Sequence, residues 1–243
     1  MIQLPPPEFR PLGVDGILVR FARELSEQAN QRALAFRNQV DAMALPGVTE
    51  VASSLTSVRV AFDRELTDRA AVTRALQIAC GKLDSADGSP KRLWQIPVAF
   101  GPDYAPQLAE AAALAGYTPE QAIAEIEAQT LRVIAIGFAP GQPYLGMLPP
   151  AWDIPRQTSL TEKMPNGALV AAVRQLIIFA ADAPTGWRHI GQTAFAVYRP
   201  DAPEPFALAP GDAVTFRQIS DSEFATLHQN TDTNGGATCK VLS

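Results

Sequence analysis

The sequence predicts an α+β fold in two parts: an N-terminal α/β domain over residues 1–92, and a C-terminal domain of short strands with two leading helices over residues 93–243. Helical and strand-like periodicities alternate in the first half of the chain. The chain holds 21 prolines, against about 12 at average usage, and they concentrate in the second half. Because proline is excluded from helix interiors and central strands, that half is expected to consist of short strands and structured loops.

The N-terminal domain is predicted from two amphipathic helices and the strands beside them. Apolar residues recur every three or four positions from Leu25 to Met43, and Pro46-Gly47 ends this helix. The expected elements, in order, are strand 17–21, helix 25–43, strand 58–62, helix 67–83 and strand 94–100. With one further strand between the two helices, the order is strand–helix–strand–strand–helix–strand, that of a two-layer sandwich, ferredoxin-like in outline.

The C-terminal domain is expected to open with two helices. The first covers residues 104–115, and Thr118-Pro119-Glu120-Gln121 starts the second with an N-cap, a proline at the first position and a capping-box glutamine. Short strands are expected at 133–136, 168–173, 176–179, 194–198 and 213–217, with a short helix at 222–227. Such a series is typical of an all-β barrel or sandwich. The tail Gln229–Ser243 is expected to be loose.

A polar, turn-rich stretch, Asp84–Lys91, separates the two parts. It places the domain boundary between Asp84 and Gln95. We expect limited proteolysis to cut there before it cuts Gly137–Pro149.

Composition argues against several classes of protein. The chain has 25 acidic and 20 basic residues, a net charge of −5, which argues against a nucleic-acid or anionic-membrane binder. Two cysteines, Cys80 and Cys239, rule out a disulfide framework and a Cys-based zinc cluster, and Cys80 is expected to be a buried structural thiol. No signal peptide is recognised, and the apolar run Ala168–Ala181 is too short to span a membrane. We expect a cytoplasmic protein.

Common catalytic motifs are absent from the sequence. Only two histidines are available, His189 and His228, which excludes a His-rich metal site and favours packing or surface roles for both. Gly186–Thr193 has the spacing of a phosphate-binding loop, but Gln192 stands where a lysine would reach the phosphates, and a strand pattern follows. No metal site, no such nucleotide loop and no general base can be assigned.

The most unusual segment is Gly137–Gly146, which reads GFAPGQPYLG. Its glycines allow positive φ, its prolines fix φ, and Phe138 and Tyr144 add flat surfaces. A rigid irregular loop of this kind can present backbone N–H groups to a ligand. A tightly packed structural crossover explains the same residues equally well.

Several blocks of the sequence follow the pattern of one known family. Gly137–Pro149 is close to G-F-x-P-G-F-P-Y-L-G-G-L-P, with Gln142 and Met147 as departures. Further blocks follow in the family's order at Pro155-Arg156, Met164–Leu169, Ala183–Thr193 and Leu208–Phe216. Over nearly its whole length the chain therefore resembles the bacterial 5-oxoprolinase subunit designated B, a carboxyltransferase domain C and D type protein also called allophanate hydrolase subunit 1. The same family includes the KipI kinase inhibitor.

This resemblance implies a cyclophilin-like β-barrel for the C-terminal domain and a role in a heteromer. Family members pair with a companion cyclophilin-like, carboxyltransferase-type subunit, and with a third hydrolase subunit the complex hydrolyses 5-oxoproline to glutamate at the expense of ATP. Related domains occur in urea carboxylase. ATP is thus the cofactor implied for the complex, whereas this chain has no biotin attachment site and is not expected to carry biotin.

Some positions depart from the family pattern. The family's G-Q-T-G-I-Y-P becomes Arg174–Ala180, in which Gln175 is retained but Leu176 and Ile177 replace a hydroxyl residue and a glycine. A family histidine position falls on Ile126. If that histidine carries a proton, this chain cannot use it. The fold is expected to survive these changes, but the ancestral active site need not.

Under the resemblance, a groove for a substrate or a partner is expected among residues of these blocks. Its candidate residues are Phe138, Pro140, Gly141, Tyr144, Gly146, Arg156, Gln175, Asp182 and Trp187. Arg156 suits a carboxylate or phosphate, and Gln175 suits an amide or carbonyl. Structural roles stay open for the same residues: an ion pair of Arg156 with an acidic neighbour such as Asp153, a backbone hydrogen bond for Gln175, a turn cap for Asp182 and core packing for Trp187.

Two functions of different classes are therefore carried forward. The chain is either a subunit of an ATP-dependent amidohydrolase, active only in a complex, or a non-catalytic regulatory binder such as a KipI-like histidine-kinase inhibitor. A urea carboxylase or allophanate hydrolase-related role is a further alternative. In each case the isolated chain is expected to have little or no 5-oxoprolinase activity.

Overall fold

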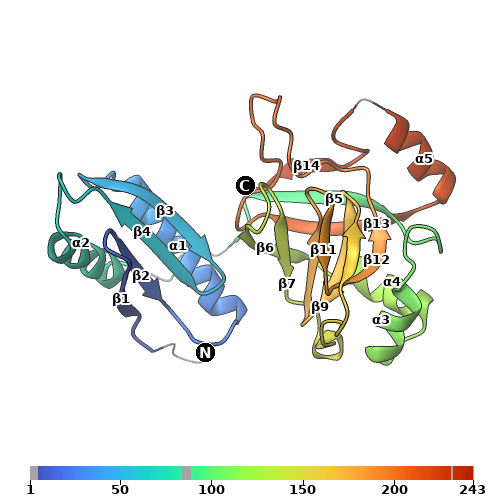
Figure 1. Ribbon diagram of the computed structural model, residues 1–243, viewed down its shortest axis with the longest axis horizontal. Helices are drawn as coiled ribbons and strands as arrows, with labels where there is room; N and C mark the ends of the chain where they lie inside the picture. Colours follow the sequence, from blue (N-terminus) through green and yellow to red (C-terminus); the bar gives the residue numbers. More distant parts are fainter. Residues whose placement is uncertain (1–4, 84–88, 231, 243) are drawn as a thin grey trace. The chain divides into compact units, whose positions relative to one another are not determined.

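The computed structural model describes residues 5–83, 89–230 and 232–242, and the chain divides into two compact units, Met1–Ser89 and Pro90–Ser243 (Figure 1). Of the stretch predicted to separate two domains, residues 84–88 lie outside the described residues.

The first unit is a four-stranded antiparallel sheet with two helices on one face. Its elements are β1 (Glu8–Leu12), β2 (Gly16–Arg20), α1 (Glu27–Ala42), β3 (Val48–Ser54), β4 (Ser57–Phe62) and α2 (Arg69–Gly81). The helices begin where the sequence offers caps, since Ser26 accepts a hydrogen bond from Ala29 N and Asp68 accepts one from Ala71 N. Alternate residues of β2 and β4 point to the helices and form the core with Phe36 and Leu76. Cys80 lies at the edge of this core, half-buried, and burial raises the pKa of its thiol to about 11.

The ferredoxin-like order predicted for this unit is not confirmed. The sheet order is β1-β2-β4-β3, so the strand beside β2 is the N-terminal β1 rather than the strand predicted at 94–100. That later strand, β5 (Arg92–Ala99), belongs to the second unit. Its burial explains why: Ile96–Ala99 are all buried, as in a strand covered on both faces, whereas β1 is mostly exposed and carries a proline, as edge strands do.

The second unit is a closed β-barrel. Its elements are β5, α3 (Leu108–Leu114), α4 (Pro119–Ala128), β6 (Leu131–Ile136), β7 (Pro143–Gly146), the 3-10 helix η1 (Pro150–Trp152), β8 (Thr161–Met164), β9 (Ala168–Ala172), β10 (Gln175–Ile178), β11 (Ala183–Thr185), β12 (Arg188–Gln192), β13 (Ala213–Ile219), α5 (Asp221–Gln229) and β14 (Thr238–Val241). Seven strands run in the order β12-β9-β10-β7-β6-β13-β5, and a pairing of β12 with β5 closes the ring. β14 adds to the outer edge of β5, and β8 and β11 form a separate ribbon.

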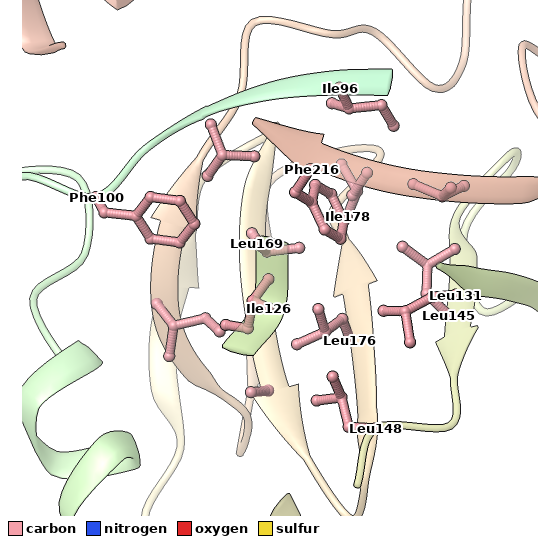
Figure 2. Packing of buried hydrophobic residues seen from close by; sticks show 14 of the residues in the cluster. Ile96, Phe100, Ile126, Leu131, Leu145, Leu148, Leu169, Leu176, Ile178 and Phe216 are labelled. Atoms are coloured by element: carbon pink, nitrogen blue, oxygen red, sulfur yellow. The ribbon is translucent and has the colours of Figure 1, made fainter. Parts of the chain in front are cut away.

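Side chains fill the barrel, and two further layers pack around it. Figure 2 shows the interior, where Leu145, Leu169, Leu176 and Ile178 point toward Phe216 and their neighbours. Residues of α3 and α4 join the same core, and α4 starts with the capping box that the sequence predicts at Thr118. The opposite face of β9 and β10 carries a second apolar cluster: Met164, Ala168, Val170, Ala172, Ile177, Phe179 and Trp187.

Two predictions for this unit are wrong. Residues 194–198 do not form a strand. Phe195 and Val197 are buried, as the apolar alternation predicts. The backbone of the segment, however, forms hydrogen bonds with loops and one isolated bridge from Tyr198 to Phe206. The tail is not loose either. β14 pairs with β5, and Gly235 packs so closely on Ala194 that a Cβ would lie 2.2 Å from its carbonyl carbon.

Candidate functional site

The Gly- and Pro-rich segment is partly loop and partly strand. Residues 137–142 close on themselves, since Gly137 N donates to Gln142 O at 3.0 Å and Gln142 N donates to Ala139 O at 3.1 Å. Gly141 has φ +73°, and a Cβ there would lie 3.0 Å from both Tyr198 Cβ and Val197 O. The irregular loop predicted to extend to Gly146 therefore ends at Gln142, and Pro143–Gly146 is the barrel strand β7.

Three of the candidate residues lie together on the outer face of the barrel. The rings of Tyr144 and Trp187 meet edge to face, with centroids 6.2 Å apart. The guanidinium carbon of Arg156 lies 5.2 Å above the centre of the Trp187 ring. Trp187 is only 5% exposed and belongs to the second apolar cluster, whereas Arg156 is exposed to solvent. The structure thus places a cation on a rigid aromatic support.

The charge of Arg156 has no counter-ion in the part of the chain that the structure describes. The pair with Asp153 that offered a structural explanation is not formed. The contact with the Trp187 ring leaves the N–H donors of the guanidinium available to a ligand. Arg156 is therefore the candidate residue best suited to hold an anion.

Tyr144 is half-buried, and its environment shifts the pKa of its hydroxyl group. Burial raises the pKa of this hydroxyl, and the positive charge of Arg156 and a hydrogen bond with the Gln142 side chain act in the opposite direction. Gln142 is 1% exposed, and its Oε1 accepts a long hydrogen bond of 3.4 Å from Ala180 N. Sequence analysis noted Gln142 only as a departure from the family pattern. Its position as a polar residue between Gly141 and Pro143 was the one sign that it could belong to the site.

Gln175 and Gly146 face each other across β10 and β7. In this register Ile177 is opposite Tyr144, and Gln175 is two positions before Ile177, so Gln175 lies on the same outer face. A Cβ at Gly146 would lie 3.0 Å from Ile134 Cδ1 and 3.5 Å from Gln175 Cγ. The glycine therefore leaves the space that the Gln175 side chain uses.

The other candidates do not join Arg156 and Trp187. Asp182 is paired with Lys163 at 3.0 Å and accepts a hydrogen bond from Asn166 N at 2.9 Å. These two contacts, the backbone bond first, hold the pKa of its carboxyl below the usual value. Asp182 thus has the turn-bracing role that the sequence left open. Phe138 is 74% exposed and makes no ring contact with the described residues, and Pro140 is also exposed.

No acid or base for catalysis emerges from the positions that depart from the family. Ile126 and Leu176 are fully buried in the barrel core and Ile177 is 2% exposed. His189 is also buried, with Nε2 3.2 Å from Gln192 Oε1, and burial lowers its pKa. Within the described ranges we find neither a group of three or more His, Cys, Asp or Glu side chains suited to a metal ion, nor a helix of the length and apolarity needed to cross a bilayer.

Comparison with known protein families gives a match over most of the chain. Residues 7–208 match the carboxyltransferase domain, subdomain C and D, so the chain belongs to this family. The 5-oxoprolinase subunit designated B of Bacillus subtilis (strain 168) is 28% identical over 223 residues, covering 88% of this chain and 93% of the relative. The subunit of the same name from Haemophilus influenzae is 27% identical over 206 residues, covering 85% of this chain and 95% of the relative.

Solved structures share the fold. The protein TTHA0988 is 30% identical with a TM-score of 0.74 over 84% of this chain, which spans 40% of that protein. The conserved uncharacterized protein PH0987 from Pyrococcus horikoshii is 26% identical with a TM-score of 0.52, covering 89% of this chain and 99% of that protein. The Kluyveromyces lactis urea carboxylase is 15% identical with a TM-score of 0.76, over 97% of this chain and 24% of that protein, and shows the fold alone.

Proposed function

We propose that the chain is a subunit of an ATP-dependent amidohydrolase of the 5-oxoprolinase type, which opens 5-oxoproline to glutamate in the cytoplasm. It would act with a companion cyclophilin-like, carboxyltransferase-type subunit and a third hydrolase subunit. The carrying observation is the likeness to the Bacillus subtilis 5-oxoprolinase subunit, because it covers 88% of this chain and 93% of the relative. Arg156 supports the proposal, since it lies over the Trp187 ring without a counter-ion among the described residues and 5-oxoproline carries a carboxylate.

The catalytic chemistry is assigned to the complex rather than to this chain. The described residues bring no acid–base pair next to Arg156, and ATP is expected to bind elsewhere in the complex. The role left to this chain is to bind and orient the substrate or to hold the companion subunit in its active form. This division of labour explains why the isolated chain is expected to be inactive.

The test is reconstitution. The chain is co-expressed with candidate companion and third subunits, and ATP hydrolysis is measured with and without 5-oxoproline, with allophanate as the alternative substrate. We expect hydrolysis that depends on 5-oxoproline and on all three chains. Full activity of a complex that lacks this chain, or robust turnover by this chain alone, would show the proposal to be wrong.

One observation favours a non-catalytic binder as the second candidate. The side chains at 126, 176 and 177 are apolar and buried, so these positions offer no group for proton transfer. A regulatory subunit needs none. If the reconstituted complex is inactive while the chain inhibits autophosphorylation of a histidine kinase encoded beside it, the KipI-like function replaces the hydrolase.

A further inference from the structure

Three arginines of the first unit converge on a single carboxylate. Glu8 Oε2 lies 2.7 Å from a terminal nitrogen of Arg10 and 2.8 Å from one of Arg20, and Glu8 Oε1 lies 3.4 Å from one of Arg23. Glu8 and Arg20 are opposite each other in the register of β1 and β2. Because alternate residues of β2 point into the core beneath the helices, this pair lies on the other face of the sheet.

The carboxylate of Glu8 leaves most of this positive charge without a counter-ion. In the part of the chain that the structure describes, Glu8 is the only acidic side chain that forms an ion pair with any of the three arginines. Hydrogen bonds from Arg20 and Arg10 lower the pKa of its carboxyl to about 2, so Glu8 stays ionised. Three cations held around one anion attract a further anion.

The cluster holds more donors than a cross-strand ion pair needs. Among the described residues, the side-chain hydrogen bonds of all three arginines go to Glu8. Arg20 Nε is shielded from solvent and has no hydrogen-bond partner there either. The Arg23 side chain is 75% exposed, and its 3.4 Å contact is long for a charge-assisted hydrogen bond. Most of the guanidinium N–H groups therefore have no protein acceptor.

We propose that Arg10, Arg20 and Arg23 form a binding site for a phosphate dianion, carried by orthophosphate or by a phosphate monoester. A phosphate group carries a charge of about −1.5 to −2 at pH 7, which matches the charge that Glu8 leaves unbalanced. The planar fork of arginine also fits the geometry of phosphate oxygens. The site belongs to the first unit and does not rest on the proposed function.

The test compares two anions at two pH values. The purified full chain is titrated by calorimetry with orthophosphate and with sulfate, at constant low ionic strength. At pH 7.5 we expect orthophosphate to bind with a Kd below about 1 mM, because several charge-assisted hydrogen bonds form. At pH 5.5 it should bind at least about threefold more weakly, because it has taken up its second proton.

Sulfate is the control for effects of pH on the protein. It remains a dianion at both pH values and Glu8 stays ionised, so its affinity should change by less than about twofold. An equal fall for both anions contradicts a preference for the dianion. Absence of orthophosphate binding up to about 10 mM at pH 7.5 overturns the proposal, whatever the activity of the reconstituted complex.

Adenosine monophosphate distinguishes the two sources of the phosphate group. If it binds at least about fivefold more tightly than orthophosphate, the ligand is a phosphate monoester. Equal or weaker binding identifies orthophosphate as the ligand. Adenosine lacks the phosphate and should bind at least about tenfold more weakly than adenosine monophosphate. Equal affinity for these two compounds contradicts a site for phosphate.

Variants assign the binding to residues. Arg20→Gln is expected to weaken orthophosphate binding by at least about tenfold, and Arg23→Gln by about fivefold. Arg59→Gln is the matched control, since Arg59 lies on the same sheet face and forms a one-to-one pair with Glu50 at 2.6 Å. It should change the affinity by less than about twofold. A loss as large in Arg59→Gln as in Arg20→Gln contradicts the assignment.

Thermal unfolding separates binding from strand pairing. Because Arg23 is exposed and its contact with Glu8 is long, Arg23→Gln should leave Tm unchanged while it weakens orthophosphate binding. If Arg10→Gln and Arg23→Gln both bind orthophosphate normally, the cluster is a cross-strand ion pair and the proposal is wrong. These two variants test the site even if Arg20→Gln is unstable.

Discussion

The ion pair between Arg92 and Asp212 is expected to be the most costly single polar contact to remove from the barrel. The Asp212 side chain is 6% exposed. Its carboxylate accepts hydrogen bonds from Arg92 Nε at 2.9 Å, from a second Arg92 nitrogen at 2.5 Å and from Ala209 N at 2.8 Å. The two residues stand at the starts of β13 and β5, which pair in parallel. Removing the carboxylate frees three donors at the point where these strands meet.

The magnitude follows from the burial of each partner. Breaking a buried ion pair by removing one side costs about 3–5 kcal/mol. Arg92 is 30% exposed, so water can solvate part of the stranded guanidinium, and we expect about 3 kcal/mol for Asp212→Ala. For a unit of this size, that loss corresponds to a fall in Tm of about 6–12 °C. Asp212→Asn keeps the shape and one acceptor and should cost less.

The assay is urea unfolding followed by circular dichroism, with thermal scans alongside. Asp182→Ala is the matched control, because its partner Lys163 is exposed and its own side chain is 49% exposed. Exposed pairs contribute about 0–1 kcal/mol. If Asp212→Ala loses less than about 1 kcal/mol, or no more than Asp182→Ala, the reasoning from burial is refuted.

Three further outcomes are expected. Val173 has φ 44° in the turn between β9 and β10, which is a strained value for a branched residue. Val173→Gly should therefore raise the free energy of unfolding by about 0.5–1 kcal/mol in the same urea assay. A loss of stability contradicts this. Burial lowers the pKa of His189 in the folded chain below its usual 6.5, so as pH falls the imidazole is protonated in the unfolded chain first. The free energy of unfolding should therefore fall as pH drops below 6.5. His189→Gln should reduce this dependence of stability on pH. Limited proteolysis followed by mass spectrometry should find the first cut within Asp84–Lys91, and an earlier cut within Gly137–Pro149 counts against the boundary.

The helices were predictable because their signals are local. The periodicity from Leu25 to Met43 and the capping box at Thr118 are both complete within a few neighbouring residues, and the structure has helices at both places. Apolar alternation at 58–62 likewise marks β4. No partner elsewhere in the chain is needed to read these patterns.

Strand partners were less accessible, because pairing is decided by distant residues. The run at 94–100 was correctly read as a strand but assigned to the wrong sheet, since nothing local distinguishes an edge of the first sheet from a barrel strand. The sequences of the polar strands β1, β3 and β14 show little apolar alternation. They form strands chiefly because each pairs with a neighbouring strand that has a free edge.

The sequence by itself determined the family, the two helices of the first unit, the two leading helices of the second unit and the residue types of the site. The sequence alone was enough to identify the motif residues around Tyr144 and Trp187 and the arginine after Pro155. Only the tertiary structure decided that Arg156 lacks a counter-ion among the described residues, that Asp182 is already paired, and that Gln142 is buried with its Oε1 as an acceptor. Charge balance, burial and hydrogen-bond direction depend on which groups meet across the barrel face, and sequence spacing does not specify those meetings.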